Sequence, residues 1–313
     1  MINKRSNIFL AGHNGMVGSA ILRKLKEKKF LNIITINKKK LDLTNQRNVL
    51  NFFAKHKIDC VILAAAKVGG IIANNTYKSE FLYENLMIQS NIINASFKNG
   101  IKDLIFFGSS CVYPNTFSRP IKETDLLSNY LEPTNEPYAV AKIAGIKLCE
   151  NYAKQYNLNY KSLMPCNLFG VNDSFDLTNS HFLPGIIHKI YLAKKKNKKK
   201  LVLLGTGQAK RELMYVDDLA DACIYFLNTK TRENLINIGS GFERKISNYV
   251  QKVQNLLEAN DIEIIYNMKK ELDGTKRKVL DTKIARKYGW KPKSGFDESL
   301  KITYQYFLDH VAN

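Results

Sequence analysis

A glycine-rich turn near the start of the chain separates a short apolar run from a stretch with helical periodicity. The apolar run covers residues 7–11, and apolar side chains return at helical spacing at positions 21, 22 and 25. Glycines in such a turn let the backbone bend tightly and approach a pyrophosphate, which the positive end of the following helix stabilises. The strand–turn–helix context predicts a dinucleotide-binding fold, with the cofactor-binding residues Gly12, Gly15, Met16, Val17 and Gly18.

The rest of the first half alternates apolar runs with stretches of helical spacing. We expect strands at residues 32–36, 59–66, 104–108 and 161–165 and helices at residues 48–57, 81–99 and 138–156. This alternation predicts an α/β fold with a doubly wound parallel Rossmann sheet, whose ligand lies outside the carboxyl ends of the strands. We assign residues 1–165 to the nucleotide-binding Rossmann domain, with a return near 212–238, and residues 166–313 mainly to a smaller C-terminal substrate-binding lobe.

The end of the second expected strand indicates which dinucleotide binds. An NAD-selective protein usually carries an acidic residue there, which binds the ribose hydroxyls. Here Asn37 is followed by lysines at positions 38–40. Cations without a carboxylate favour a 2′-phosphate, so we predict NADP(H); an exposed loop is the alternative interpretation of these lysines. Small side chains at the end of the third strand, Ala65 among them, let the cofactor approach.

A tyrosine and a lysine four residues apart, Tyr138 and Lys142, lie on one face of an expected helix. An ammonium near a phenol stabilises the phenolate and brings proton exchange closer to neutral pH. Ser109 follows the strand at 104–108 and can hold a substrate carbonyl oxygen against the Tyr138 proton. The three side chains together predict hydride transfer to or from a carbonyl. For the helix pair alone, a half-buried tyrosine beside a solvated lysine is the alternative.

The formal charge of +20 is the unusual feature of the composition. Lysine runs at 38–40 and 194–200 are patches of the kind that nucleic-acid binders carry. However, no aromatic residues are interleaved with the second run, and lysine and asparagine are abundant along the whole chain. We therefore interpret that run as a solvated loop and expect no nucleic-acid partner. A general positive field also favours anionic substrates such as nucleotides.

The cysteines and the apolar runs indicate in which compartment the protein is expected. The chain has five cysteines, an odd number, and no Cys-x-x-Cys pair. This pattern predicts reduced thiols and neither a disulfide framework nor a metal site. Because no run of about 18 apolar residues is present and the first residues do not read as a signal peptide, we expect a cytoplasmic protein with no membrane partner.

Four longer runs are more specific than any single pair of residues. They are residues 64–70 (AAAKVGG), 108–111 (GSSC), 131–138 (LEPTNEPY) and 143–150 (IAGIKLCE). Together they resemble the GDP-L-fucose synthase family of the extended short-chain dehydrogenases/reductases, a group that the Gly-x-x-Gly-x-x-Gly spacing also suits. The resemblance implies an NADPH-dependent C4 reductase and 3,5-epimerase of a GDP-linked 4-keto-6-deoxy sugar. It further implies a homodimer formed through helices of the nucleotide-binding domain and a role in bacterial surface polysaccharide.

The resemblance also implies roles for individual residues. Ser109, Tyr138 and Lys142 match the residues that reduce C4, and Cys111 and His181 match those that exchange protons at C3 and C5. A C4 ketone acidifies the hydrogens on its neighbours, so a thiolate base and an imidazole acid suit this chemistry. The structural alternatives are a buried small hydrophobe for Cys111 and a loop histidine for His181. The matches to substrate-binding residues are Asn167, Lys189 and Arg211.

The chain departs from the family pattern at three positions near the ligands. Lys189 stands where an Arg commonly grips the diphosphate, Leu204 where a Trp is usual, and Asn14 where an Arg helps to bind the 2′-phosphate. Lysine keeps the charge but loses the bidentate fork. Lys38 is left as the main matching cation for the cofactor phosphate. A C4 reductase of a related substrate, such as a GDP-4-keto-6-deoxyheptose, with epimerisation by another enzyme, therefore stays open.

Three other classes fit the residues less well. A nucleotide-sugar 4,6-dehydratase normally carries an acidic pair where this chain has Ser110 and Cys111. A 4-epimerase retains NAD(H) tightly, whereas the lysines at 38–40 favour an exchangeable NADPH. A non-enzymatic NADP sensor or a nucleic-acid binder has no need of Tyr138 and Lys142.

Overall fold

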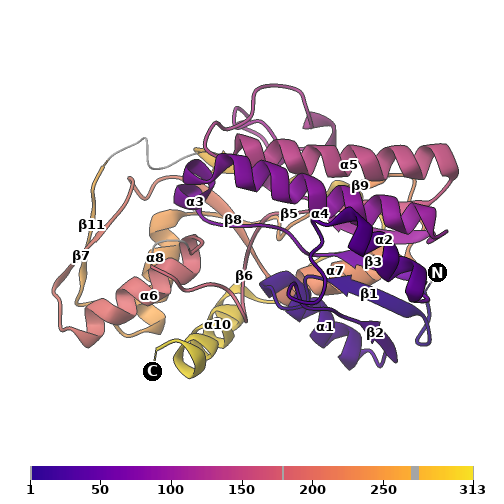
Figure 1. Cartoon of the computed structure of the whole chain (residues 1–313). Coiled ribbons are helices and arrows are strands. Elements are labelled where there is room, and N and C mark those ends of the chain that lie inside the picture. Colours follow the sequence, from indigo (N-terminus) through magenta and orange to yellow (C-terminus); the bar gives the residue numbers. More distant parts are fainter. Residues whose placement is uncertain (1, 178–179, 269–274, 313) are drawn as a thin grey trace.

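The computed structural model of the chain describes residues 2–177, 180–268 and 275–312 (Figure 1). In this part of the chain, a six-stranded parallel sheet has the strand order β2-β1-β3-β4-β5-β9. Its strands are β1 (Asn7–Ala11), β2 (Asn32–Ile34), β3 (Cys60–Leu63), β4 (Asp103–Phe107), β5 (Asn159–Pro165) and β9 (Leu235–Ile238). The inner strands β3 and β4 are buried on both faces, which is why the sequence shows apolar runs there instead of alternation.

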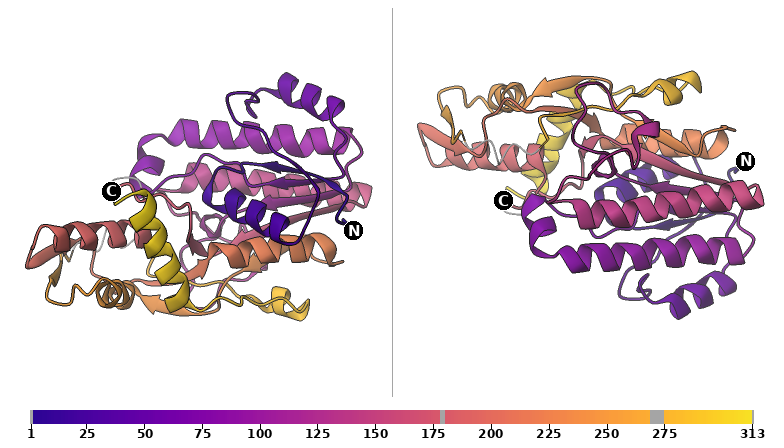
Figure 2. Two further views of the ribbon diagram at one scale, coloured as in Figure 1. Left: turned by 90° about the horizontal axis from the view of Figure 1, so that it is seen from below. Right: turned by 90° about the horizontal axis from the view of Figure 1, so that it is seen from above.

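Helices cover both faces of this sheet (Figures 1 and 2). On one face, α1 (Met16–Glu27) packs beside α7 (Val216–Asn228). On the other face lie α2 (Gln46–Lys55), α4 (Lys78–Lys98) and α5 (Glu136–Tyr156), with α4 and α5 side by side along their length. The predicted α/β fold with a parallel Rossmann sheet is confirmed.

The strand at the far edge of the sheet, β9, comes from late in the chain. Leu163 of β5 is paired with Ile236, and Pro165 is paired with Ile238. The chain therefore leaves the sheet after Pro165 and returns to it only at Leu235. Everything between these positions, including α7, is made before the sheet is complete.

A second group of elements lies at the carboxyl ends of the parallel strands, on the left of Figure 1. Here β8 pairs with β10 in antiparallel and with β12 and β6 in parallel, and β7 pairs with β11. The strands are β6 (Asn167–Phe169), β7 (Lys200–Leu203), β8 (Lys210–Tyr215), β10 (Glu243–Lys245), β11 (Glu263–Tyr266) and β12 (Arg277–Lys278). The helices are α6 (Phe182–Lys195), α8 (Ile246–Leu256) and α10 (Phe296–His310), whereas the short helix α9 (Lys283–Lys287) packs against β9 of the central sheet.

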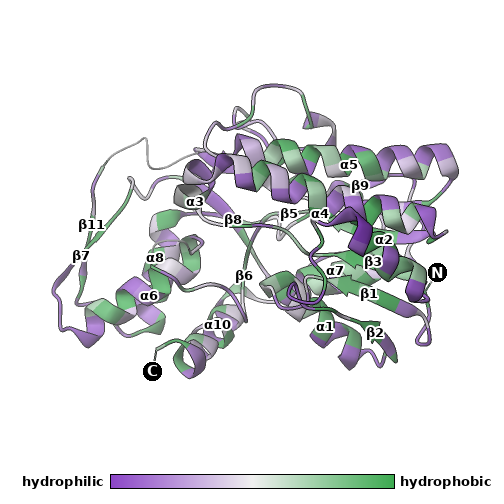
Figure 3. Cartoon of the chain, in the orientation of Figure 1, coloured by the Kyte–Doolittle hydropathy of each residue, from purple (hydrophilic) through white to green (hydrophobic). Residues whose placement is uncertain are grey.

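Hydrophobic residues are concentrated in the central sheet and on the helix faces that cover it (Figure 3). Ile8, Val61, Ile105 and Leu163, one from each of four neighbouring strands, are fully buried. A core of this kind fixes the strand ends relative to one another, and the loops that leave these ends can hold side chains in a defined arrangement.

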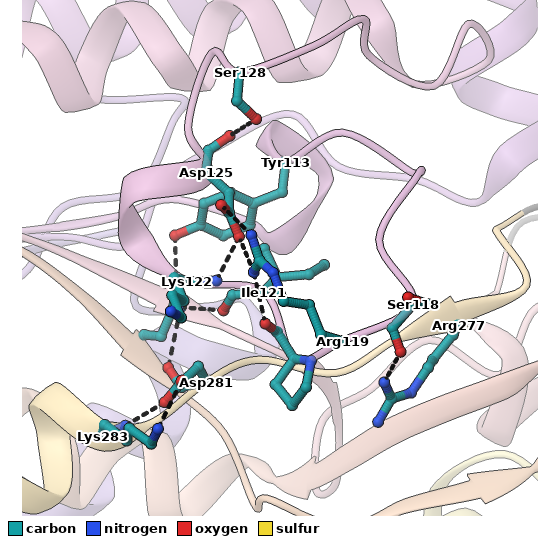
Figure 4. Close-up of polar contacts among 12 residues, drawn as sticks. Tyr113, Ser118, Arg119, Ile121, Lys122, Asp125, Ser128, Arg277, Asp281 and Lys283 are labelled. Atoms are coloured by element: carbon teal, nitrogen blue, oxygen red, sulfur yellow. Dashed lines mark hydrogen bonds and ion pairs between the residues drawn. The ribbon is translucent and has the colours of Figure 1, made fainter.

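The loop at residues 113–128 is tied to the segment that includes and follows β12 (Figure 4). The backbone N–H of Asp281 donates to the carbonyl oxygen of Ile121 at 2.7 Å. The Arg277 guanidinium donates to the Ser118 carbonyl oxygen. A segment that lies more than 150 positions later in the chain is thereby held beside the loop that leaves β4.

Some elements differ in extent from those expected. The second strand ends at Ile34 and not at position 36, because the Asn37 carbonyl oxygen accepts the N–H groups of Lys40 and Leu41 and so turns the chain. A short helix that we did not expect, α3 (Ile71–Thr76), precedes α4. The polar loop before α5 contains two short 3₁₀ turns, at Ser110–Val112 and Glu123–Asp125.

The described residues contain no group of three or more His, Cys, Asp or Glu side chains arranged to hold a metal ion. Within the same residues, no helix combines the length and the apolar character needed to cross a membrane.

Candidate active site

The glycine turn between β1 and α1 packs directly against the end of β3. Gly12 has a φ of +89°, and a Cβ atom on it would lie 2.5 Å from the Ala65 backbone nitrogen. A Cβ atom on Gly18 would lie 2.0 Å from the Gly12 carbonyl oxygen. Side chains are thus excluded from both positions, and the turn leaves its backbone N–H groups at the N-terminus of α1, which begins at Met16. The Nδ1 atom of His13 is also buried there without a partner among the described residues.

The end of β2 lies beside this turn. The Asn14 side-chain amide donates to the Asn37 side-chain oxygen at 2.9 Å. The Lys38 side chain is 79% exposed, and its Nζ lies 3.8 Å from a Glu84 carboxylate oxygen. The other oxygen of Glu84 is 2.5 Å from Lys67 Nζ. An exposed, weakly paired ammonium at this place can turn to an incoming phosphate.

Ser109, Cys111 and Tyr138 come together where β4 ends. Ser109 Oγ accepts the backbone N–H of Cys111 at 3.2 Å, because Ser109 starts the 3₁₀ turn Ser110–Val112. Tyr138 is in the first turn of α5, which Pro137 helps to start. Burial raises the pKa of Tyr138 well above its ordinary value, Cys111 adds to that rise, and a side-chain hydrogen bond with Ser109 acts in the opposite direction.

Lys142 lies one helical turn after Tyr138 and is buried. Its Nζ donates to the Phe107 carbonyl oxygen at 2.8 Å and lies 5.8 Å from the centre of the Tyr138 ring. Burial lowers the pKa of Lys142 to about 7. The sequence predicted that the Lys142 ammonium would lower the pKa of the Tyr138 phenol. In the structure, burial has the larger effect and raises that pKa. The Lys142 ammonium points at the Phe107 carbonyl oxygen, and burial disfavours its charged form.

Cys111 is the one cysteine that is not buried; Cys60, Cys149, Cys166 and Cys223 all are. Its thiol lies 3.3 Å from the Nζ of Lys278, which belongs to β12. Both side chains line one small pocket at the end of β4. The lining residues are Ser110, Cys111, Tyr113, Pro114, Asn115, Ile121, Glu132, Asn135, Thr275 and Lys278.

His181 occupies the N-cap position of α6 without a side-chain capping hydrogen bond, and half of its side chain is exposed. Its Nδ1 lies 3.7 Å from an oxygen of Asp173, whose side chain is buried. The nearby Asp173 carboxylate raises the pKa of His181, and partial burial of the imidazole opposes this rise. Among the residues that the structure describes, His181 is not part of the lining of the Cys111 pocket.

The three residues matched to substrate binding lie on different elements. Asn167 starts β6, Lys189 lies half-buried on α6, and Arg211 lies on β8. Arg211 is in register with Arg244 of β10 on one side and with Lys278 of β12 on the other. Three cations therefore stand in one row across this sheet.

Sequence reasoning did not single out Lys278, Arg244 or Asp173. The first two enter the site through strand pairing between distant segments, for which local periodicity carries no signal. Asp173 was within reach of sequence reasoning, since it precedes His181 in the same loop region, but nothing in the spacing distinguishes it from Asp176.

Comparisons with known proteins agree with this geometry. The family model described as the NAD dependent epimerase/dehydratase family matches residues 8–239. The GDP-L-fucose synthase of Escherichia coli strain K12 is 42% identical, over 98% of this chain and 98% of that protein. GDP-L-fucose synthase 1 of Arabidopsis thaliana is 45% identical, over 100% of this chain and 96% of that protein.

Solved structures show the same likeness. The structure of a GDP-6-OMe-4-keto-L-xylo-heptose reductase from C. jejuni superposes with a TM-score of 0.91 and 31% identity, covering 98% of this chain and 99% of that one. A GDP-L-fucose synthetase from Naegleria fowleri bound to NADP has a TM-score of 0.90 and 26% identity, covering 100% of this chain and 96% of that one. The chain therefore belongs to the NAD dependent epimerase/dehydratase family, and within it to the group of the GDP-L-fucose synthases.

Proposed function

We propose that this protein is an NADP-dependent oxidoreductase that reduces the C4 ketone of a GDP-linked 4-keto-6-deoxy sugar and inverts C3 and C5 of the same sugar. The observation that carries the proposal is the meeting of Ser109, Cys111 and Tyr138 at the carboxyl end of β4. The close relatives in sequence, at 42–45% identity over the whole chain, are GDP-L-fucose synthases, which supports this choice of substrate class.

The glycine cradle fits a dinucleotide. The glycines of the turn carry no side chains where a pyrophosphate needs to approach the backbone. Lys38, beside the turn, can reach a 2′-phosphate. The residues that hold the cofactor in this proposal are Gly12, Gly15, Met16, Val17, Gly18, Lys38, Ala65 and Lys142. When bound, NADPH supplies the hydride to C4.

In the reduction, Ser109 and Tyr138 act on the C4 oxygen. The Ser109 hydroxyl donates a hydrogen bond to the carbonyl oxygen and orients it. The Tyr138 phenol then gives its proton to the oxygen as the bond order to carbon falls. The raised pKa of Tyr138 keeps the phenol protonated at neutral pH, which is the form that this step requires. Lys142, held by the Phe107 carbonyl oxygen, fixes the helix turn that carries Tyr138.

In the epimerisation, Cys111 and His181 serve opposite faces of the sugar. The C4 ketone acidifies the hydrogens on C3 and C5, so a thiolate can remove a proton while the electron pair moves to the C4 oxygen. An imidazolium returns a proton to the same carbon from the other face. Because Asp173 raises the pKa of His181, a larger fraction of the imidazole carries the proton at neutral pH.

The nucleotide part of the substrate is polyanionic, and the second group of elements offers cations to it. Arg211 and Lys189 are the proposed ligands of the diphosphate, with Asn167 near the sugar. We further propose a homodimer formed through α4 and α5, which lie side by side and carry the exposed side chains Tyr83, Val140 and Tyr156. The free state of the five cysteines supports a cytoplasmic location.

The experiment that tests this function is a reaction with NADPH and GDP-4-keto-6-deoxymannose in D₂O. Oxidation of NADPH is followed at the nicotinamide absorbance band, and the product sugar is examined by NMR. We expect NADPH oxidation, deuterium at C3 and C5, and an L-galacto product. Oxidation of NADPH without deuterium in the sugar ring would support the C4 reductase activity and contradict the epimerase activity. No oxidation with this sugar or with its heptose analogue would overturn the proposal.

A second candidate is a C4 reductase of a GDP-4-keto-6-deoxyheptose. Two observations favour it: Lys189 and the 61% exposed Leu204 replace an Arg and a Trp, and similar solved structures include a GDP-mannoheptose C4 reductase from Campylobacter jejuni with NADP bound. A competition assay with equal amounts of the two keto sugars distinguishes the candidates. The substrate with the larger kcat/KM is consumed first.

A further inference from the structure

Lys278 and Cys111 are joined by a contact that no local pattern in the sequence shows. Lys278 Nζ lies 3.3 Å from Cys111 Sγ, although 167 positions separate the two residues. The contact exists because β12 pairs with β8 in parallel, which brings Lys278 into register with Arg211 and toward the end of β4.

The position of Lys278 is fixed by its backbone and by its neighbours. Arg277, the residue before it, points to the other face of the strand, where its guanidinium pairs with Glu243 at 2.7 Å. After Lys278, the Leu280 N–H donates to a buried Glu212 carboxylate oxygen at 2.8 Å, and the Val279 carbonyl oxygen accepts the Ile121 N–H at 2.9 Å. The strand geometry therefore presents the Lys278 ammonium to the pocket.

Other polar or charged groups line this pocket or lie close to Cys111 and Lys278. Glu132 is the carboxylate among the lining residues, and its Oε2 atom accepts from the side chains of Thr134 and Asn135 at 2.5 and 2.7 Å. Tyr138 lies on the α5 side and is neutral, because its pKa is raised. Arg211, in register with Lys278, adds a second positive charge. In the part of the chain that the structure describes, the ion pairs do not include Lys278.

We propose that Lys278 is a positioning residue that holds Cys111 in its thiolate form and thereby makes it the base of the epimerisation. The proposal rests on the proposed function and deepens it. An ammonium within hydrogen-bond distance stabilises a thiolate over a thiol, and the thiolate is the form that accepts a proton.

The proton transfer balances without any further reactant. The thiolate takes one proton from the carbon next to the C4 ketone and becomes a thiol, while the electron pair of the broken C–H bond moves onto the C4 oxygen. The Lys278 ammonium donates a hydrogen bond to the sulfur before the transfer and keeps its own proton throughout. It touches the sulfur and acts on the sugar only through Cys111.

Alkylation by iodoacetamide measures the thiolate fraction without any sugar present. The reagent is neutral, the thiolate displaces iodide from it, and Cys111 is the cysteine within reach because the other four are buried. The variants are Lys278→Met, Lys278→Gln and Lys278→Arg. Lys283→Met is the matched control, since it removes one positive charge at a nearby position whose side chain is 86% exposed. Cys111→Ser gives the background rate.

We expect Lys278→Met and Lys278→Gln to slow alkylation about tenfold at pH 7 and to move the pH of half-maximal rate upward. Lys278→Arg and Lys283→Met should keep the profile of the unchanged protein. Superimposable pH profiles for the unchanged protein and the two neutral variants would overturn the proposal. The neutral variants differ in shape, so a profile moved by only one of them would also count against a role for the charge.

A turnover experiment separates this inference from the proposed function. In D₂O with NADPH and the keto sugar, Lys278→Met should reduce ring deuteration about tenfold at pH 7 and reduce NADPH oxidation by a smaller factor. Equal loss of both, with unchanged alkylation, would make Lys278 a substrate ligand and overturn the inference. If the unchanged protein oxidises no NADPH, the proposed function fails, and the alkylation profile still decides whether Lys278 controls the thiol.

Discussion

The Nζ of Lys142 donates a hydrogen bond to the carbonyl oxygen of Phe107 at 2.8 Å, so that a helix ammonium is bound to the last residue of β4. The bond fixes α5 against the strand that carries Ser109 and Cys111. It also places a charged group in a buried position, which lowers the pKa of Lys142 to about 7. A basic group in this situation makes stability depend on pH.

The Lys142 contribution to the stability of the cofactor-free protein should increase as the pH rises from 7 to 8, while Glu212, whose pKa burial raises to about 7, contributes with the opposite sign. The folded pKa of Lys142 lies below the ordinary 10.5, so the unfolded chain binds more protons at this residue in this window, and the Lys142 contribution to the free energy of unfolding rises with pH. Lys142→Met should remove up to about 1 kcal/mol of this rise. The measurement is urea unfolding at pH 7 and 8. The pKa of Lys161 is lowered to about 8, so Lys161 changes stability in the same direction as Lys142. If the free energy of unfolding of Lys142→Met changes with pH as it does in the wild-type protein, Lys142 makes no contribution to the pH dependence.

Tyr138→Phe should lower the rate of C4 reduction by a factor of about 10² to 10⁴, because it removes the general acid and little volume. NADPH binding, followed by fluorescence titration, should stay unchanged. Tyr130→Phe, at an 89% exposed position in the loop before α5, is the matched control and should keep full activity. Normal turnover by the Tyr138→Phe variant would remove Tyr138 as the acid.

Asp173→Asn should lower the pKa of His181, since the carboxylate is the main cause of its rise. In a pH titration by NMR, the His181 ring signals should change at a lower pH in the variant, while those of His310 at the end of α10 should not move. Ring deuteration of the sugar should decline at a lower pH as well, and hydride transfer should not. A His181 titration that is the same in both proteins would contradict the assigned pair.

Gly18→Ala should abolish NADP(H) binding or folding of the turn, because the added Cβ atom would lie 2.0 Å from the Gly12 carbonyl oxygen. Gly295→Ala is the matched control, since a Cβ atom there meets nothing within 4 Å. Cofactor affinity and thermal unfolding of both variants decide the point. A Gly18→Ala protein with normal affinity would show that the turn can open at little cost.

Lys38→Ala should weaken NADPH about tenfold and NADH little, because the ammonium is proposed to bind only the 2′-phosphate. The ratio of the two dissociation constants is the measured quantity, and Lys55→Ala at the end of α2 is the control for charge. An unchanged ratio would show that selectivity resides in other groups near Asn14 and Asn37, which are hydrogen-bonded to each other at 2.9 Å.

The parts of the structure that follow from local sequence were the predictable ones. The glycine turn, the apolar strands and the helix that carries Tyr138 depend on spacing and burial within about twenty residues, and each is present, although β2 and β3 end earlier than expected. The register of β12 against β8 depends on residues 67 positions apart, and the contact of Lys278 with Cys111 was therefore invisible.

Protonation behaviour was the least predictable property. Lys142 was expected to acidify Tyr138, but the balance of burial and hydrogen bonds raises the Tyr138 pKa instead. Residue types at a given spacing specify which groups can meet. The dielectric surroundings of those groups depend on the packed structure.

The late return of the chain to the central sheet has a consequence for synthesis on the ribosome. Until residues 235–238 have been made, β5 is an edge strand, with its outer row of N–H and C=O groups unpaired. A nascent chain that stalls or is cut between Pro165 and Leu235 therefore exposes a strand that is buried in the complete fold and is open to pairing with another chain. Such fragments should aggregate, and the cell has reason to shield this interval of translation with a chaperone.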